Sequence, residues 1–475
     1  MMKTLKTDPN ARPAWTAGLL ALALILAQSG KATAENVVTL KQDDGYRGIW
    51  YSNQKTGDEY VYKYSGGMAT YPQQHTPIAC YAPEVNKTFF VYGGTRSDKQ
   101  QLLHMVSYYD HASGKVPRPR ILLDKQTDDA HDNPTLSIDA AGHLWIFSNS
   151  HGTSRPSYIH RSVEPYSIDA FERTAETNFS YGQPWILADG RFVLMHTRYQ
   201  AGHRVMYSMA SVSGRTWEKP RQVAHIEAGH YQVTYSDGRR VATAFNFHPL
   251  RGGLNERTNL YYLESDDAGV TWHTAAGGTV DTPLTQIDNS ALAIDYRAQK
   301  LLVYLKSVQF DGDGRPIILY LTSRGHEPGP ANDPRVWRIA HWTGQEWDVR
   351  DVTTSDHNYD YGSLYLESAN DWRLIAPTDP GAQPFGTGGQ MVLWTSGDRG
   401  QSWQKVKALT HDGHRNHSYA RQPLGARDDF YALWADGDTR APSESALYYT
   451  DRQGSHVWRL PRHMTTDTAA AEVAW

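Results

Sequence analysis

The side chains best suited to chemistry in this sequence are histidines, tyrosines and arginines that recur at equivalent places in a repeated strand pattern. His131 begins an H-D-N-P segment, and His151 follows twenty residues later, just before a glycine. Tyr199 comes after the next alternating run, and Arg204 opens the strand beyond it. Functional residues usually gather on loops at one end of a rigid scaffold, so we expect these four to converge.

Histidine, tyrosine and arginine together suit β-elimination on a uronic acid. An arginine or a protonated histidine stabilises the enolate-like charge that develops beside the carboxylate. A neutral histidine or a tyrosinate takes the C5 proton, and a tyrosine or histidine donates one to the leaving O4. A glycosidase would instead need two carboxylates across the scissile bond, and a serine hydrolase would need an elbow motif that the sequence lacks.

The elements that position these residues are short strands, because alternating runs bounded by Gly, Asp and Asn replace any long helical periodicity after residue 35. Two segments, 265–272 and 396–403, share the pattern S-x-D-x-G-x-[ST]-W, and a degenerate copy ends at Trp217. The pattern resembles the Asp-box turn, in which Asp and Ser side chains close a hairpin and Trp packs between sheets.

A second register predicts the number of repeats. Innermost strands are expected to start near seven positions, which are His75, His131, Tyr181, Tyr231, Asn289, Tyr361 and His417. We therefore predict an all-β, seven-bladed β-propeller, closed by pairing of residues 44–51 with the last blade. The Asp-box marks the structural face, so starts of innermost strands and ends of second strands lie on the opposite, functional face.

Bulk composition limits the function further. The 475 residues carry a net charge of −4, which excludes the basic footprint of a nucleic-acid-binding protein.

The N-terminal residues predict a signal peptide over residues 1–34, because three basic residues precede an apolar run over 17–27 and the sequence Ala32-Thr33-Ala34. Residues 35–475 then form a single catalytic domain. The acidic residues Asp128, Asp129 and Asp132 match no calcium-loop pattern, and we expect them to be solvated turn residues.

Several segments give the chain a resemblance to a known family. They include Y-R-G-I-W-Y from Tyr46, the pair H-D-N-P and H-G at His131 and His151, and N-H-S-Y-A-R from Asn416. The chain resembles the BNR-4 type polysaccharide lyases, which include seven-bladed propeller ulvan lyases and rhamnose–glucuronate lyases. The resemblance covers nearly all of residues 35–475, and the twenty-residue spacing of the two histidines is its most specific part.

The resemblance implies roles for individual residues. His131 and His151 would form the catalytic centre, one binding or neutralising the uronate and the other transferring a proton. Tyr199 best matches the catalytic tyrosine and Arg204 the neutralising arginine. The residues expected to bind substrate are Tyr181, Arg198, Tyr231 and Arg421. Some relatives bind a metal ion, and His248 is the candidate ligand for one.

The sequence therefore predicts a secreted or periplasmic polysaccharide lyase that cleaves an ulvan-like rhamnose–glucuronate linkage. The alternatives are a lyase of plant arabinogalactan-type glycans, a BNR-type glycoside hydrolase and a non-catalytic sugar-binding propeller. The expected partner is an acidic polysaccharide, with no nucleic acid, no membrane span after signal cleavage and a monomeric state. The chemistry requires no cofactor, although the family pattern allows a structural zinc or calcium ion.

Overall fold

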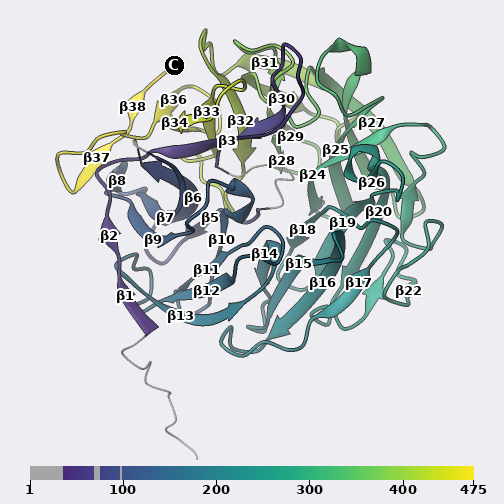
Figure 1. Ribbon diagram of the computed structural model, residues 1–475, viewed down its shortest axis with the longest axis horizontal. Helices are drawn as coiled ribbons and strands as arrows, with labels where there is room; N and C mark the ends of the chain where they lie inside the picture. The colour runs from purple at the N-terminus through teal and green to yellow at the C-terminus, as the bar shows by residue number, and fades with distance from the viewer. Residues whose placement is uncertain (1–35, 69–74, 97–98) are drawn as a thin grey trace, which may run out of the picture.

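Short runs of aliphatic, aromatic and β-branched residues form antiparallel strands, and the strands group into sheets that stand around a common centre (Figure 1). The computed structural model describes residues 36–68, 75–96 and 99–475. The predicted signal peptide over residues 1–34 lies outside this range. Among the described residues, no helix has the length and apolar character needed to cross a bilayer. The all-β propeller class is confirmed.

Six sheets are regular blades, built mainly from strands that follow one another along the chain. The first comprises β10 (Pro134–Ile138), β11 (Leu144–Ser148), β12 (Ser157–Ser162) and β13 (Ala170–Thr177), with β1 (Val37–Thr39) at its outer edge. The second comprises β14 (Ser180–Ile186), β15 (Phe192–Gln200), β16 (His203–Ser211) and β17 (Arg221–Ala224). The third comprises β18 (Gln232–Ser236), β19 (Val241–Phe247), β20 (Thr258–Ser265), β21 (Trp272–His273), β22 (Thr279–Val280) and β23 (Leu292–Ile294).

The other three regular blades complete the middle and end of the chain. The fourth comprises β24 (Leu302–Phe310), β25 (Pro316–Ser323), β26 (Arg335–Trp342) and β27 (Trp347–Ser355). The fifth comprises β28 (Ser363–Leu366), β29 (Trp372–Asp379), β30 (Gln390–Ser396) and β31 (Gln404–Ala408). The sixth comprises β32 (Asn416–Arg421), β33 (Ala432–Gly437), β35 (Leu447–Thr450), β36 (Val457–Arg459) and β38 (Glu472–Val473).

The remaining sheet is a composite of ten strands drawn from both ends of the chain. Its members are β2 (Lys41–Gln42), β3 (Gly48–Lys55), β4 (Tyr62–Gly66), β5 (Ala79–Ala82), β6 (Lys87–Arg96), β7 (Lys99–Asp110), β8 (Lys115–Pro117), β9 (Arg120–Asp124), β34 (Ser443–Ser445) and β37 (Thr468–Ala470). Gly48 pairs with Ser445 of β34 and with Gly94 of β6, so β3 joins the two ends of the chain as predicted. The count of seven equivalent blades is wrong, because the structure has six regular blades and this composite sheet.

One predicted blade start is also wrong. The innermost strand of the fourth blade begins at Leu302 rather than near Asn289. The short strands β22 and β23 extend the third blade beyond its fourth strand β21, and Asn289 lies in the loop between β22 and β23. The predicted start of this strand was therefore about a dozen residues too early, because the turn residues near Asn289 resemble those that precede a strand.

The Asp-box turns fix the orientation of the blades. In the copy between β20 and β21, the Ser265 hydroxyl accepts a hydrogen bond from the Gly269 amide at 2.8 Å, and Asp267 accepts from the Thr271 amide at 2.9 Å. Trp272 is buried against the neighbouring sheet. The copy between β30 and β31 repeats these bonds. Both join the third strand of a blade to the fourth, as predicted, so His131 and His151 lie on the opposite face.

Three fully buried histidines should make the fold sensitive to acid. Burial lowers the pKa of His75, His196 and His230 to about 3 each, from an ordinary value of 6.5. Below pH 6.5 the unfolded chain binds protons at these sites while the folded chain does not. We therefore expect the free energy of unfolding to fall between pH 6.5 and about pH 3, by at most about 2 kcal/mol per histidine at pH 5. Urea unfolding at pH 7 and pH 5 measures this, and equal stabilities would contradict it.

Candidate active site

The two predicted histidines meet at one end of the hairpin formed by β10 and β11. His131 lies in the short 3-10 helix η2 (Ala130–Asp132), directly before β10, and His151 follows β11. Their rings stack with centroids 4.2 Å apart and planes 24° apart. The His131 side chain is 3% exposed and that of His151 is 28% exposed, so His151 is the one that solvent and ligands can reach.

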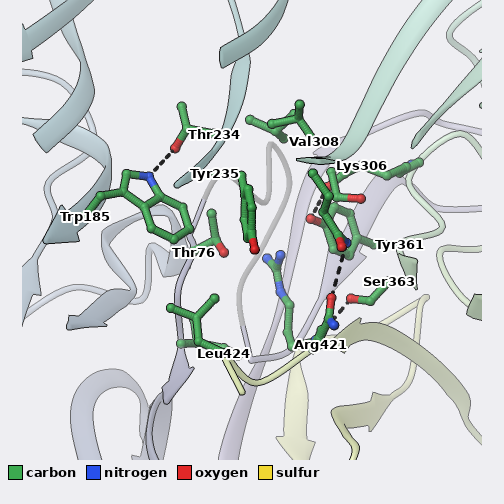
Figure 2. A pocket seen from close by; sticks show the side chains of 15 residues that line it. Thr76, Trp185, Thr234, Tyr235, Lys306, Val308, Tyr361, Ser363, Arg421 and Leu424 are labelled. Carbon is green, nitrogen blue, oxygen red and sulfur yellow. Dashed lines mark hydrogen bonds between the residues drawn. The ribbon is translucent and has the colours of Figure 1, made fainter. Parts of the chain in front are cut away.

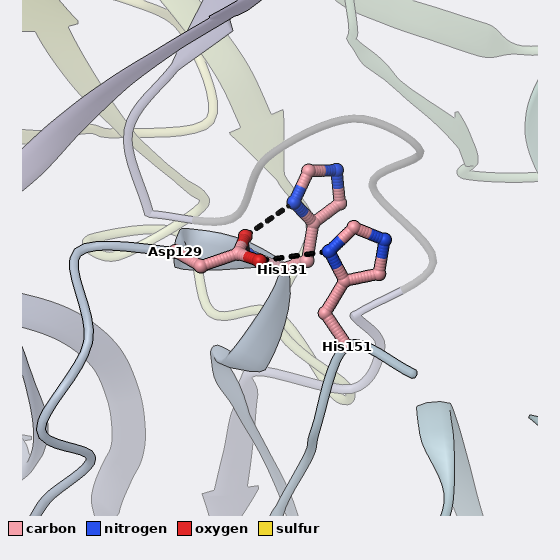
Figure 3. Close-up of side chains that lie close together, drawn as sticks. All are labelled: Asp129, His131 and His151. Carbon is pink, nitrogen blue, oxygen red and sulfur yellow. Dashed lines mark hydrogen bonds and ion pairs between the residues drawn. The ribbon is translucent and has the colours of Figure 1, made fainter. Parts of the chain in front are cut away.

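Asp129 bridges the two rings (Figure 3). Its Oδ1 lies 2.5 Å from Nδ1 of His131, and its Oδ2 lies 2.7 Å from Nδ1 of His151. Burial alone would raise the pKa of Asp129, but the attraction and hydrogen bonds of the two histidines outweigh it and hold this pKa well below the usual range. The ionised carboxylate accepts a hydrogen bond from the Nδ1–H of each ring, which leaves both Nε2 atoms as lone-pair acceptors when the rings are neutral.

The two Nε2 atoms have different surroundings. Nε2 of His131 lies 3.0 Å from the hydroxyl of Tyr64, a residue of β4 whose pKa burial raises well above its ordinary value. Burial also lowers the pKa of His131, despite the attraction of Asp129. Within the described residues, Nε2 of His151 makes no hydrogen bond, and Figure 3 shows it pointing away from Asp129. His151 is therefore the ring that is placed to exchange a proton with a ligand.

A largely buried network of ion pairs contacts the histidine pair through the backbone of His151 and the carboxylate of Asp129. Asp132 is fully buried; its Oδ2 accepts from Nε of Arg155 at 2.8 Å and its Oδ1 accepts from the backbone amide of His151 at 2.6 Å. Nη2 of Arg155 also reaches Asp129 at 3.2 Å, and the buried Lys125 lies 3.5 Å from Asp132. The expectation that Asp129 and Asp132 are solvated turn residues is therefore wrong. Asp132 is fully buried and paired with Arg155 and Lys125, and Asp129, whose side chain is 18% exposed, is paired with the two histidines and Arg155.

Asp132→Ala should destabilise the fold strongly. The substitution leaves the Lys125 ammonium buried without its carboxylate, and breaking a buried ion pair in this way lowers the free energy of unfolding by about 3–5 kcal/mol. Urea denaturation of the variant measures the loss. Asp128→Ala, at an exposed neighbouring position, serves as the control and should stay within about 0.5 kcal/mol of wild type. A loss below about 1 kcal/mol for Asp132→Ala would contradict the network.

Tyr199 and Arg204 complete the cluster from the second blade. They face each other directly across β15 and β16, with the guanidinium carbon of Arg204 5.3 Å from the Tyr199 ring centre. The ring of Tyr199 lies 5.7 Å from that of His151. Burial raises the pKa of Tyr199 to about 12, despite the neighbouring Arg204. Tyr199 therefore keeps its proton at neutral pH and is better suited to donate one than to accept one.

Tyr181 and Tyr231 are buried beside this cluster. The hydroxyls of Tyr181 and Tyr199 lie 2.9 Å apart, and the ring of Tyr231 lies 6.0 Å from that of Tyr181. Tyr181 adopts a left-handed backbone with φ of +54°, at an irregularity in the pairing of β14 and β15. Such strain persists only where the surroundings enforce it and is common at functional sites. The predicted His131, His151, Tyr181, Tyr199, Arg204 and Tyr231 thus come together.

Two predicted arginines lie elsewhere. Arg198 precedes Tyr199 in β15, so its side chain lies on the other face of the strand, where its guanidinium stacks over Tyr207 at 5.9 Å. Arg421 is buried and lines a separate pocket, where its guanidinium lies 4.2 Å from the ring of Tyr361 (Figure 2). Neither residue contacts the histidine pair, so the prediction that they bind substrate at this centre gains no support.

The surroundings of His248 do not favour a cation. It is fully buried, its ring lies 4.7 Å from that of Tyr231, and neither ring nitrogen has a hydrogen-bond partner within the described part of the chain. Burial lowers the pKa of His248 well below its ordinary value, and the positive charges of Arg204, Arg257 and Lys63 lower it further. A metal ion bound to His248 would meet these positive charges without a carboxylate ligand.

Asp129, His131 and His151 have the residue types of a metal site, and one ligand atom from each lies within 4.8 Å of the others. Both Nδ1 atoms nevertheless face the Asp129 carboxylate at hydrogen-bond distance, which requires that each carries a proton. The Arg155 guanidinium, 3.2 Å from Asp129, adds a positive charge beside the carboxylate. The donor set therefore fits a proton-transfer centre better than a cation site.

Sequence reasoning missed several residues of this site. Asp129 and Arg155 are only a few residues from the predicted histidines, and the D-x-H spacing at Asp129 was the available signal. Tyr64 reaches His131 from the N-terminal strand β4, and the buried Arg257 lies 5.0 Å from the Tyr231 ring and donates to the Tyr359 hydroxyl at 3.2 Å. These two come from distant segments, so no local pattern marks them.

Comparisons with known proteins show which family the chain belongs to. Residues 79–355, more than half of the chain, match the model of BNR repeat-containing family members. An ulvan lyase of Nonlabens ulvanivorans is 24% identical over 405 residues, which cover 75% of this chain and 81% of the relative. An ulvan lyase-PL25 of Pseudoalteromonas sp. (strain PLSV) is 22% identical over 303 residues, which cover 55% of this chain and 60% of the relative.

Solved structures share the fold. A polysaccharide lyase PL25 ulvan lyase superposes with a TM-score of 0.68 at 17% identity, covering 86% of this chain and 96% of the other. A structure of a PL25 ulvan lyase bound to -[GlcA(1-4)Rha3S]- gives a TM-score of 0.67 with the same coverage and identity. The polysaccharide lyase Uly1 gives 0.59 at 10% identity, covering 90% of this chain and all of the other.

Proposed function

The chain belongs to the BNR repeat-containing family and is a polysaccharide lyase, and we propose that it cleaves a glucuronate-containing glycan at an ulvan-like rhamnose–glucuronate linkage. The observation that carries the proposal is the pairing of one ionised carboxylate with two histidines, beside a protonated tyrosine and an arginine. Two relatives are ulvan lyases, and one structural neighbour is bound to -[GlcA(1-4)Rha3S]-, which supports this substrate class.

In the proposed reaction, Arg204 neutralises the uronate carboxylate and so stabilises the enolate-like charge on the way to the product. Nε2 of His151 accepts the C5 proton, and the Tyr199 hydroxyl donates its proton to O4 as the C4–O4 bond breaks. The electron pair of the C5–H bond forms the C4=C5 double bond. Solvent then returns His151 and Tyr199 to their starting protonation states. His131, hydrogen-bonded at both ring nitrogens, orients His151.

These roles follow from the protonation states of His151 and Tyr199 before the reaction. Asp129 holds the His151 proton on Nδ1, which leaves Nε2 basic, as the carboxylate of a catalytic triad does for its histidine. The raised pKa of Tyr199, about 12, keeps a proton available for the leaving oxygen. A glycoside hydrolase would need two carboxylates able to act on a sugar, whereas Asp129 and Asp132 are both occupied by ion pairs. The proposed chemistry requires no metal or organic cofactor.

Absorbance at 235 nm tests the proposal, because the unsaturated uronate absorbs there. We expect ulvan to give a steady rise that stops when the protein is omitted. Reducing sugar released without any rise would indicate hydrolysis, and binding without either product would indicate a carbohydrate-binding protein. An arabinogalactan-type glycan as the better substrate would place the enzyme among lyases of plant glycans. The absence of a rise with every uronate polymer would overturn the elimination.

Tyr199→Phe should lower kcat about 100-fold, because it removes the proton donor for O4. The loss is smaller than for the base, since the Tyr181 hydroxyl, 2.9 Å from that of Tyr199, can supply a proton through water. Turnover is followed at 235 nm. Tyr207→Phe is the matched control, because Tyr207 belongs to the same hairpin but contacts Arg198 on its other side. Tyr199→Phe with kcat within threefold of wild type would remove Tyr199 from the acid role.

We also propose that residues 1–34 direct export and that residues 35–475 act as one catalytic domain, as a monomer. N-terminal sequencing of protein recovered outside the cytoplasm tests the first statement, with cleavage expected between Ala34 and Glu35. Light scattering tests the second.

A further inference from the structure

A cavity on the same face of the propeller as the histidine pair is lined by positively charged side chains. It has a volume of about 530 Å³ and lies between the loop that follows β19 and the loop that precedes β24. Its charged lining residues are Arg251, Arg297, Lys300, Arg324 and Glu256, so four cations face one carboxylate. The volume is in the range of pockets that hold small ligands such as one or two sugar units.

The cations of this cavity are largely uncompensated. Arg297 lies 3.7 Å from Asp288, but among the described residues Arg251, Lys300 and Arg324 have no carboxylate within 4.0 Å. All four cations are exposed, in a protein whose net charge is −4. A local cluster of unpaired cations on an otherwise acidic protein attracts anions from solution.

The cavity lies on the same face as the catalytic centre. Lys300 precedes β24 and Arg324 follows β25, as His131 precedes β10 and His151 follows β11. Equivalent hairpin ends of propeller blades share one face.

One short segment separates the cavity from the active site. Gly252, Glu256 and Thr258 line the cavity, while Arg257, between them, turns inward to Tyr231 and Tyr359. Pro249 lines it as well, directly after His248, whose ring faces Tyr231. A glycan chain that occupies the active site and runs outward over this segment would bring later sugar units to the cavity.

We propose that this cavity binds an anionic sugar unit of the same glycan, a uronate or a sulfate ester, several units from the bond that is cleaved. The inference rests on the proposed function for the identity of the polymer. Attachment at a second point keeps the polymer close to the catalytic centre after each dissociation, which raises its effective concentration there. The contacts are solvent-exposed, so added salt weakens them.

Binding without turnover tests the subsite. Ulvan is titrated by calorimetry into His151→Ala protein, with and without the added pair Lys300→Ala and Arg324→Ala. Loss of these two exposed cations should weaken binding about 10-fold at low salt, and about 0.5 M NaCl should largely remove the difference. Arg315→Ala, in the turn at the opposite end of the same β24–β25 hairpin, is the matched control and should leave affinity within twofold. Desulfated and carboxyl-reduced ulvan then identify which anion is bound.

Each outcome decides the proposal separately from the catalytic one. Equal affinities of the double variant and the Arg315→Ala control, or no binding of ulvan below about 1 mM, would overturn the subsite. The double substitution could also lower the affinity for desulfated ulvan, for carboxyl-reduced ulvan and for native ulvan by the same factor. That result would overturn the subsite, because a site that binds an anion must respond when the anion is removed. If the double variant binds more weakly but no uronate polymer yields an unsaturated product, the subsite stands and the lyase reaction on this polymer fails.

Discussion

Replacing Asp129 by asparagine is expected to lower kcat about 1,000-fold with little change in KM. The asparagine side chain keeps the size of the carboxylate but presents an amide, which can accept from one ring nitrogen and not from both. One histidine then turns or changes tautomer, and the charge that stabilises a protonated His151 during C5 proton transfer is lost. Loss of the equivalent carboxylate in a catalytic triad lowers kcat by about 10⁴.

Asp129 is a positioning residue in this account, so its test must separate geometry from folding. Turnover at 235 nm gives kcat and KM, and thermal unfolding of Asp129→Asn shows whether the fold survives. Asp128→Asn changes an exposed carboxylate one residue away and should keep kcat within twofold. A variant that unfolds normally yet retains more than a tenth of wild-type kcat would show that the carboxylate does not control the histidines.

The parts of this site that the sequence predicts are those fixed by the blade repeat. His131 and His151 flank one hairpin, and Tyr199 ends the corresponding strand of the next blade, so a common register was enough to bring them together. The side-chain alternation of a strand would also have excluded Arg198, because its neighbour Tyr199 faces the site and successive residues of a strand face opposite ways.

The missed residues depend on tertiary contacts. Asp132 has the sequence pattern of a polar turn residue, and only the folded chain shows that it is buried and paired with Arg155 and Lys125. Tyr64 reaches His131 from β4, sixty-seven residues earlier, through the composite sheet that gathers both ends of the chain. The extra strands β22 and β23 likewise lengthen one repeat beyond what a regular spacing predicts. Local patterns therefore predicted which side chains share one face of the propeller, whereas the pairing of Asp129 with both histidines depends on the folded structure.

His151→Ala is expected to lower kcat about 1,000-fold, within the range for loss of a general base. His151 presents the exposed half of the stacked pair, and its Nε2 carries the lone pair that Asp129 leaves available. His143→Ala is the matched control, because His143 lies in the turn at the opposite end of the same β10–β11 hairpin, where it hydrogen-bonds to the Ser162 carbonyl.

The double variant Asp129→Asn with His151→Ala gives the sharper result. If the carboxylate acts through His151, the second substitution should add less than about tenfold to the loss of the first, because residues that act as a unit are strongly non-additive. Losses that multiply to about 10⁶ would mean that Asp129 and His151 contribute independently, and the proton route through Nε2 of His151 would have to be abandoned.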